Sequence, residues 1–248
     1  MKPMIPAILL LIAIGGPTAG CRKYDGEKAA AQRNEWHESL SDSISAISTR
    51  RNTDSLRLVE LRESLAERIG SFTQVSNPRE VEPYYIQSRF KTRYPLSSTG
   101  IAARMTAGEQ AEIIAALSGP RFNAIRLSDG NQSVESDVVP ADQALNYTAR
   151  GLTTVSFTGA KADSICMFVA DHQATPLTLT YLQDGARAAQ ITLNTDQKEW
   201  IASTWGVCGA HKEARMLEKR MLSDSRKIEL LKITLAQEEE KTMAQKKE

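Results

Sequence analysis

The sequence has almost no net charge, few aromatic residues and no long apolar run. Lys and Arg number 31 against 30 Asp and Glu, so the strongly basic surface typical of nucleic-acid-binding proteins is excluded and we expect no nucleic-acid partner. Only 6% of the residues are aromatic, so any core must be built mainly from aliphatic side chains. The apolar stretch Met4–Ile14 is too short for a permanent membrane span, which needs about 20 residues.

Motifs that mark common enzymes and cofactor sites are also missing. The 14 glycines are dispersed, and none belongs to a phosphate-binding loop or to a Gly-x-Ser-x-Gly nucleophile elbow. There are three histidines, His37, His172 and His211. Cys208 and His211 with Cys166 and His172 make at most a weak zinc pattern, because the spacings match no known finger. We therefore predict no catalytic residue, no cofactor and no metal ligand.

The first twenty residues have the three parts of a secretory signal peptide. Lys2 supplies a positive start, Met4–Ile14 is the apolar segment, and a run of small residues ends at Gly20. This order is typical of a leader that is removed after export. We predict a signal peptide over 1–20, followed by Cys21 as the first mature residue.

The stretch Thr18-Ala19-Gly20-Cys21 resembles the lipobox of bacterial lipoproteins. Ala19 and Gly20 match that pattern, whereas Thr18 stands where the family usually has Leu. The resemblance implies that the Cys21 thiol carries a diacylglycerol and that its new amine is acylated, for example by palmitate. Several acyl chains, at about 0.8 kcal/mol per buried CH₂, would make the attachment to the membrane permanent. The alternative is ordinary secretion with a free thiol at Cys21.

Two further cysteines, Cys166 and Cys208, complete the set of three. If Cys21 is lipidated, an even pair remains in an oxidising compartment, which favours a disulfide. Closing that loop would stabilise the fold by roughly 4 kcal/mol in the chain-entropy model. The alternative is that Cys166, within an apolar run, serves as a small core residue.

Two long segments carry apolar residues at alternating spacings of three and four. After a polar tether over 21–35, we predict one helix over 36–74 and another over 208–242, with a frayed tail over 243–248. Their apolar positions recur with the 3.5-residue period of a helical seam. The first seam comprises Leu40, Ile44, Ile47, Arg51, Asp54, Leu58, Leu61, Leu65, Arg68 and Phe72, and the second Ala214, Leu217, Met221, Asp224, Ile228, Leu231 and Leu235.

Each seam is a narrow apolar stripe on a highly charged helix, so it needs a partner stripe of similar length. We predict that the two helices pair within one chain as an antiparallel coiled-coil stalk, which would hold the intervening region roughly 50 Å from the anchor. The alternative is self-association between chains as a parallel oligomer. The charged seam residues Arg51, Asp54 and Asp224 are of the kind that sets register or partner choice.

The region between the helices, 75–207, alternates apolar and polar residues with the period of two that is typical of strands. We predict a strand over 84–91, others around Ile101, Ile125 and Thr153, and a hairpin that turns at Asp184-Gly185. Residues 110–118 fit a strand or a helix equally well. Two short helices are expected, near 162–169 and from an Asn194 cap to Gly206. The fold class is thus α+β, with a sandwich-like β-rich domain.

One stretch combines aromatic and basic residues and is the strongest candidate for a binding patch. It comprises Tyr84, Tyr85, Arg89, Lys91, Arg93 and Tyr94. Such a stretch could bind a glycan or a partner strand. The alternative is an edge strand whose basic side chains prevent unwanted pairing.

The whole arrangement resembles bacterial envelope lipoproteins of uncharacterised function, which implies location rather than activity. We predict a non-catalytic protein of the bacterial cell envelope, anchored in the outer membrane through lipidated Cys21, in either of its leaflets. Its β-rich domain would be presented to an envelope protein or polysaccharide. The alternatives are an anchored or secreted enzyme of the hydrolase class and an oligomeric coiled-coil spacer.

Overall fold

The computed structural model describes residues 26–76, 82–142 and 144–245, which form a mixed α+β fold with two sheets and two long helices. The chain divides into two compact units, one made of 1–45 with 231–248 and the other of 46–230. The predicted signal peptide over 1–20 and the lipidation site Cys21 lie outside the described residues. No helix in the described ranges carries the long apolar stretch that a membrane crossing requires.

The helices are longer than the sequence predicted. Helix α1 spans Gly26–Ile69 and α3 spans Thr195–Gln245, while α2 spans Gly159–Asp171. The predicted tether over 21–35 is therefore helical from Gly26 onward, and the helix predicted to reach residue 74 ends at Ile69. The short helix expected from Asn194 to Gly206 and the second predicted arm are one continuous helix.

Helix α3 begins at the predicted capping residue. The Asn194 Oδ1 oxygen accepts from the Gln197 backbone N–H at 2.8 Å, and the Gln197 side chain accepts in return from the Asn194 N–H at 3.0 Å. This reciprocal pair satisfies two backbone donors that the first helical turn leaves unpaired. The predicted cap is confirmed, although the helix continues far beyond the predicted end.

Within the unit formed by 46–230, α1 and α3 run antiparallel and contact each other. Leu58 and Leu61 of α1 form an apolar cluster with Ala214 and Leu217 of α3. Two reciprocal ion pairs cross the same interface. The Arg50 guanidinium donates to Asp224 at 2.5 and 2.8 Å, and Arg220 donates to Asp54. The predicted seam residues Asp54 and Asp224 are both buried, whereas Arg51 donates to the Ser225 hydroxyl at 3.3 Å.

The first sheet has six antiparallel strands in the order β1-β2-β3-β4-β8-β7. Their bounds are β1 Phe72–Val75, β2 Tyr84–Gln87, β3 Gly100–Thr106, β4 Ala111–Ser118, β7 Asn146–Ala149 and β8 Leu152–Phe157. The ambiguous segment 110–118 is thus a strand. Because β4 lies in the interior of the sheet and is covered on both faces, its side chains are nearly all buried, which removes the alternation that would have identified it.

The second sheet has four antiparallel strands in the order β10-β9-β5-β6. Their bounds are β5 Ala124–Ser128, β6 Ser133–Glu135, β9 Thr178–Gln183 and β10 Ala186–Thr192. The predicted hairpin is confirmed: Asp184 and Gly185 join β9 to β10 with φ values of 52° and 81°. Positive φ at both central residues matches the right-handed twist of the paired strands.

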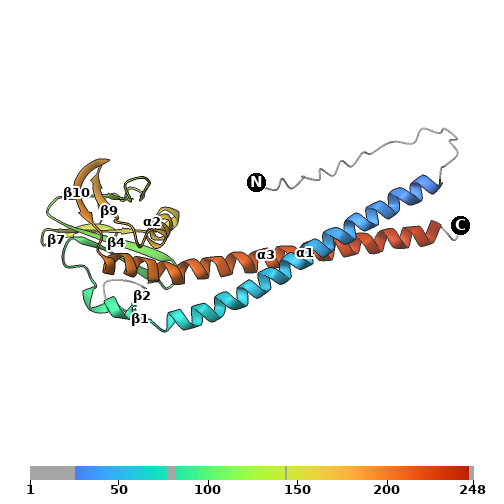
Figure 1. Cartoon of the computed structure of the whole chain (residues 1–248), viewed down its shortest axis with the longest axis horizontal. Helices are drawn as coiled ribbons and strands as arrows, with labels where there is room; N and C mark the ends of the chain where they lie inside the picture. The colour runs from blue at the N-terminus through green and yellow to red at the C-terminus, as the bar shows by residue number, and fades with distance from the viewer. Residues whose placement is uncertain (1–25, 77–81, 143, 246–248) are drawn as a thin grey trace. The chain divides into compact units, whose positions relative to one another are not determined.

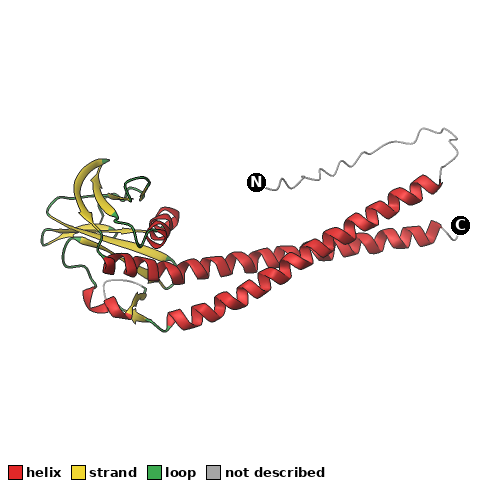
Figure 2. Cartoon of the chain, viewed as in Figure 1, coloured by secondary structure: helices red, strands yellow, loops and turns green. Residues whose placement is uncertain are grey.

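One apolar core joins both sheets to the helices. It contains Ile113 of β4, Leu179 of β9, Ile165 of α2 and Ile201 of α3. Figure 1 shows α2 beside the strands, and α2 packs against β4 and β6. In Figure 2 the first turns of α3 run alongside the yellow strands. The beginning of α3 is therefore part of the β-rich region, so the predicted boundary at residue 207 does not separate two elements.

The predicted strand over 84–91 is wrong beyond Gln87. Residues Ser88–Arg93 form a 3₁₀ helix, η1. Strand β2 pairs with both β1 and β3, so the alternative reading as an edge strand is also wrong. Phe90 is buried in η1 and stacks on Trp200 of α3, with ring centroids 4.9 Å apart. The packing of Phe90 against a helix more than a hundred residues away overrides the local alternation.

Candidate functional site

The six residues of the predicted aromatic and basic patch do not form one free surface. Tyr84 is buried, and its ring lies 5.5 Å from that of Tyr94. The Arg104 guanidinium sits 4.3 Å from the Tyr84 ring centroid and donates to the Tyr94 hydroxyl at 3.1 Å. Both aromatic rings are therefore used to pack around Arg104. Tyr85 is half-buried, and Lys91 is exposed.

The two arginines of the patch attach η1 to the beginning of α3. Arg93 donates to Asp196 at 2.5 Å, and Arg89 pairs with Asp196 and Glu199. Hydrogen bonding from Arg93 lowers the pKa of Asp196 below its ordinary value, with the charges of Arg93 and Arg89 adding to the effect. Their charges are thus already matched by carboxylates in the first turns of the helix, where negative charge also favours the helix dipole.

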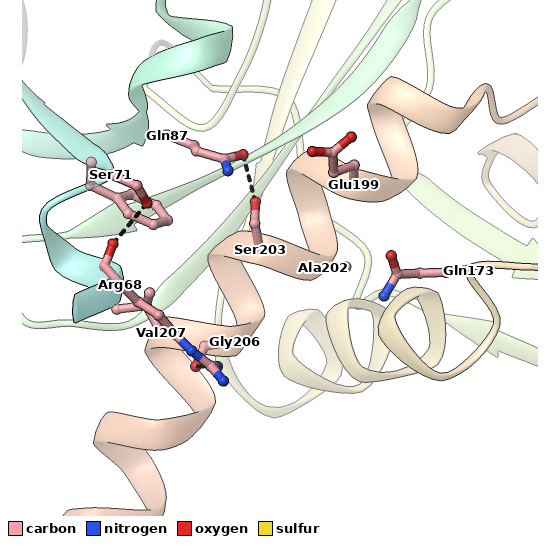
Figure 3. A pocket seen from close by; sticks show the side chains of 10 residues that line it. Arg68, Ser71, Gln87, Gln173, Glu199, Ala202, Ser203, Gly206 and Val207 are labelled. Carbon is pink, nitrogen blue, oxygen red and sulfur yellow. Dashed lines mark hydrogen bonds between the residues drawn. The ribbon is translucent and has the colours of Figure 1, made fainter. Parts of the chain in front are cut away.

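A pocket of about 330 Å³ opens beside this attachment (Figure 3). Its walls come from the end of α1, from β1 and β2, from the residues just after α2 and from the first half of α3. The residues that line it are Arg68, Ser71, Phe72, Gln87, Gln173, Glu199, Ala202, Ser203, Gly206 and Val207. Hydroxyl and amide side chains predominate among the polar ones, with one cation and one anion.

Hydrogen bonds hold several of these side chains in place. The Ser203 hydroxyl lies 2.7 Å from the Gln87 side-chain amide, and Figure 3 shows this bond across the pocket. The same hydroxyl lies 3.0 Å from the Trp200 carbonyl, and its single hydrogen serves one of the two contacts. In either arrangement at least one N–H donor of the Gln87 amide has no partner among the described residues. The Ser71 hydroxyl donates to the Arg68 carbonyl at 2.7 Å where α1 ends.

A second hollow of about 260 Å³ follows along α1 and α3. Its lining residues are Arg57, Glu60, Leu61, Ser64, Arg68, Trp205, Gly206, Gly209, Ala210 and Glu213. The Glu213 carboxylate accepts from Arg57 at 2.9 Å, and this hydrogen bond raises the pKa of Arg57. The two hollows share Arg68 and Gly206.

Two glycines inside α3 make these hollows possible. A Cβ at Gly206 would lie 3.1 Å from Arg68 Nη1, and a Cβ at Gly209 would lie 3.2 Å from the Trp205 ring. Arg68 donates to the Gly206 carbonyl at 3.1 Å. The expected helix end at Gly206 is wrong, because Gly206 and Gly209 both lie inside α3. A glycine inside a helical pattern can mark a close packing contact, and here Arg68 and Trp205 are the side chains that pack against the two glycines.

The remaining candidate residues lie apart from these hollows. Cys166 of α2 and Cys208 of α3 are both buried in the main core, as free thiols. His172 lies 3.4 Å from Asp129, and His211 lies 3.1 Å from Glu109. In the described ranges no three His, Cys, Asp or Glu side chains are grouped so that they could hold a metal ion. The disulfide between Cys166 and Cys208 stays a prediction.

Burial dominates the electrostatics of both thiols. It raises the pKa of Cys208 from its ordinary value near 9 to about 12, and it raises the pKa of Cys166 well above that ordinary value, with the nearby Cys208 adding to the effect. The fold therefore favours the protonated thiols. The protonated thiols contribute fully to the free energy of unfolding below about pH 9. This contribution is lost as the pH rises toward 12.

We expect the free energy of unfolding to fall more steeply above pH 9 in the wild-type chain than in the Cys166→Ala/Cys208→Ala variant. The difference should approach about 1 kcal/mol per pH unit for each thiol. Urea unfolding at pH 8 and pH 10.5, with reductant present, measures it. Equal pH slopes in the wild type and the variant would contradict the buried-thiol assignment.

The predicted disulfide between Cys166 and Cys208 has a test of its own. Equal counts of free thiols in the wild-type chain with and without reductant would rule it out.

Comparison with protein-family models, with curated proteins and with solved structures finds no match to this chain. The candidate site is therefore defined by its own geometry: two adjoining hollows with mixed polar and apolar walls, each containing an aromatic side chain, along one side of α3. Hydroxyl, amide, guanidinium and carboxylate groups in this arrangement can donate to and accept from a polar ligand.

Proposed function

We propose that this protein is a lipoprotein of the bacterial cell envelope that presents its β-rich domain on a helical stalk and acts by binding rather than by catalysis. Lipidation of Cys21 would attach it to the outer membrane. The leader pattern Met4–Ile14 and the small residues before Cys21 support the anchor. Helix α1 begins at Gly26, only a few residues beyond that cysteine.

The observation that carries the stalk is the pairing of α1 with α3 inside one chain. Arg50 with Asp224 and Arg220 with Asp54 form reciprocal charged contacts in antiparallel order. They adjoin one end of the apolar cluster around Leu61 and Leu217. We propose that this pairing extends as a coiled coil, because the apolar period of both helices continues to Leu40 and Leu235. This favours a monomeric hairpin over the parallel oligomer.

The binding role is supported by the two adjoining hollows along α3. Their hydrogen-bonding side chains belong to α1, β2 and α3, and to Ser71 and Gln173 just beyond the ends of α1 and α2. Rigid helices and strands hold these groups in place, as a binding surface requires. The partner is an envelope polysaccharide or protein that reaches the domain from outside the membrane.

A Cys21→Ala variant tests the anchor. Expressed in a bacterial host, the wild-type chain should incorporate labelled palmitate and sediment with the outer membrane. The variant should incorporate none and move to the aqueous periplasmic fraction, because it lacks the thiol that receives the lipid. Cys208→Ala is the matched control, since it removes a buried thiol and should leave both results unchanged.

The outcome that would contradict the anchor is equally direct. A wild-type chain found in the aqueous fraction, with a free amino-terminal cysteine and no palmitate, would show secretion without lipidation. The binding role of the domain would then be tested separately.

A further inference from the structure

The two hollows on α3 lie next to each other because Arg68 and Gly206 line both of them. They follow the same helix from Glu199 to Glu213, a rise of about 21 Å. We propose that together they form one groove that binds an extended oligosaccharide carrying acetamido groups. This inference deepens the proposed binding role and rests on it.

The hydrogen-bonding groups of the lining are complementary to those of a sugar chain. Hydroxyl and acetamido groups both donate and accept hydrogen bonds, and the groove offers side chains that do the same. The Gln87 amide contacts the Ser203 hydroxyl at 2.7 Å and has at least one further N–H donor. Arg68 uses one donor on the Gly206 carbonyl at 3.1 Å, and a guanidinium has five N–H donors. Further donors of Arg68 can therefore bind carbonyl and hydroxyl oxygens at the middle of the groove.

Each hollow also contains one aromatic side chain. Phe72 lines the first and Trp205 lines the second, and both are half-buried. The Trp205 ring packs over Gly209, where any Cβ would approach it to 3.2 Å. This close packing holds the indole in one orientation. A pyranose ring has an apolar C–H face and a polar rim, so a fixed aromatic ring beside amide and hydroxyl groups suits it well.

An extended peptide is the competing occupant, and the groove favours it less. Peptide recognition in a groove depends on apolar anchors that enter pockets or on main-chain pairing to a free strand edge. Here each hollow has one aromatic side chain among polar and apolar ones, and Glu60, Glu199 and Glu213 bring carboxylates to both hollows. Arginines already pair with these carboxylates, whose remaining lone pairs can accept from hydroxyl groups.

Titration of the full-length chain in a mild detergent with chitohexaose, which carries an acetamido group on every sugar, tests the inference. Calorimetry should show that chitohexaose binds. Maltohexaose, which has hydroxyl groups but no acetamido groups, should bind more weakly. Arg68→Ala should weaken chitohexaose binding about tenfold, the loss expected for a charged hydrogen bond. Gln87→Ala should weaken it about fivefold. Arg62→Ala removes an exposed arginine of the same helix that pairs with Glu218, and it should leave binding unchanged.

Several outcomes would overturn the inference. The first is that neither sugar binds. The second is that the Arg68→Ala variant melts at the wild-type temperature and binds chitohexaose as tightly as the wild type. The third is that penta-alanine binds in place of chitohexaose, with the same dependence on Arg68. Cys21→Ala should bind chitohexaose as the wild type does. A failure of lipidation is thus distinguishable from a failure of the groove.

Discussion

Replacing Glu112 with alanine is expected to lower the free energy of unfolding by about 3–5 kcal/mol, the cost of breaking a buried ion pair by removing one member. Glu112 of β4 lies directly opposite Arg104 of β3. The two side chains form a two-point contact at 2.7 and 3.1 Å. Only 5% of Glu112 and 9% of Arg104 are exposed, so water cannot replace the lost carboxylate. Urea unfolding of the Glu112→Ala variant measures the loss.

The chain contains a matched control for this experiment. Arg126 of β5 and Glu135 of β6 also lie directly opposite each other on antiparallel strands and pair at 2.7 Å. Their side chains are 46% and 40% exposed, so Glu135→Ala should cost less than about 1 kcal/mol. Similar losses at Glu112 and Glu135 would contradict the argument that burial decides the effect.

A second variant separates the missing charge from the missing packing. Arg104→Met/Glu112→Leu replaces the pair with apolar side chains of similar size, and it should recover most of the loss caused by Glu112→Ala. Full recovery is not expected, because Arg104 also donates to the Tyr94 hydroxyl and lies over the Tyr84 ring. A double variant no more stable than Glu112→Ala would show that the ion pair itself carries the stability.

The second large effect is expected in the association state. Asp54 and Asp224 are 5% and 1% exposed, and each is held by an arginine of the opposite helix. In the Asp54→Leu/Asp224→Leu variant both buried carboxylates become apolar side chains, whereas the two arginines stay half-exposed and can remain hydrated. A seam that has lost its buried charges distinguishes less well between its own partner helix and that of another chain. We expect this variant to form dimers or larger species, while the wild type stays monomeric.

Sedimentation of both proteins in detergent, with the Cys21→Ala background to remove any effect of the lipid, measures this change. The Glu218→Ala variant is the control, because it breaks the exposed Arg62–Glu218 pair on the same two helices. It should stay monomeric and lose less than about 1 kcal/mol. A wild-type chain that is already a stable dimer would contradict the hairpin, and a monomeric Leu variant would show that these carboxylates do not set the partner.

The acid dependence of the same contact has a defined sign. Hydrogen bonding from Arg50 lowers the pKa of Asp224 in the folded chain. The fold therefore favours the charged carboxylate, and its contribution is present above the ordinary carboxyl pKa and lost as the pH falls through the lowered value. The contact between α1 and α3 should thus weaken at acid pH, because the fold favours the charged form of Asp224. The buried thiols lose their contribution at alkaline pH instead, because the fold favours their uncharged form.

Local patterns predicted much of this architecture. The apolar period predicted most of α1, and Asn194 predicted the start of α3. Asp184-Gly185 predicted the turn between β9 and β10. These features were predictable because each depends on residues within a few positions of one another.

Other features could not be predicted because they depend on distant contacts. Residues 88–93 look like the continuation of a strand until Phe90 is seen to stack on Trp200. Gly206 and Gly209 look like helix ends until Arg68 and Trp205 are seen to pack against them. The basic side chains of Arg89 and Arg93 look free until they meet Asp196. The candidate groove was missed for the same reason.

The sequence by itself determined the two helical seams with their charged residues and the period-two pattern of the short strands between them. It also predicts the leader and its cysteine. Only the tertiary structure decided which carboxylate meets which arginine, which strands neighbour each other and where polar side chains gather into a groove. The physical reason is the distance along the chain between the residues that interact. Helix and turn formation depend on neighbours along the chain, whereas the burial of Asp224 depends on Arg50, 174 positions away.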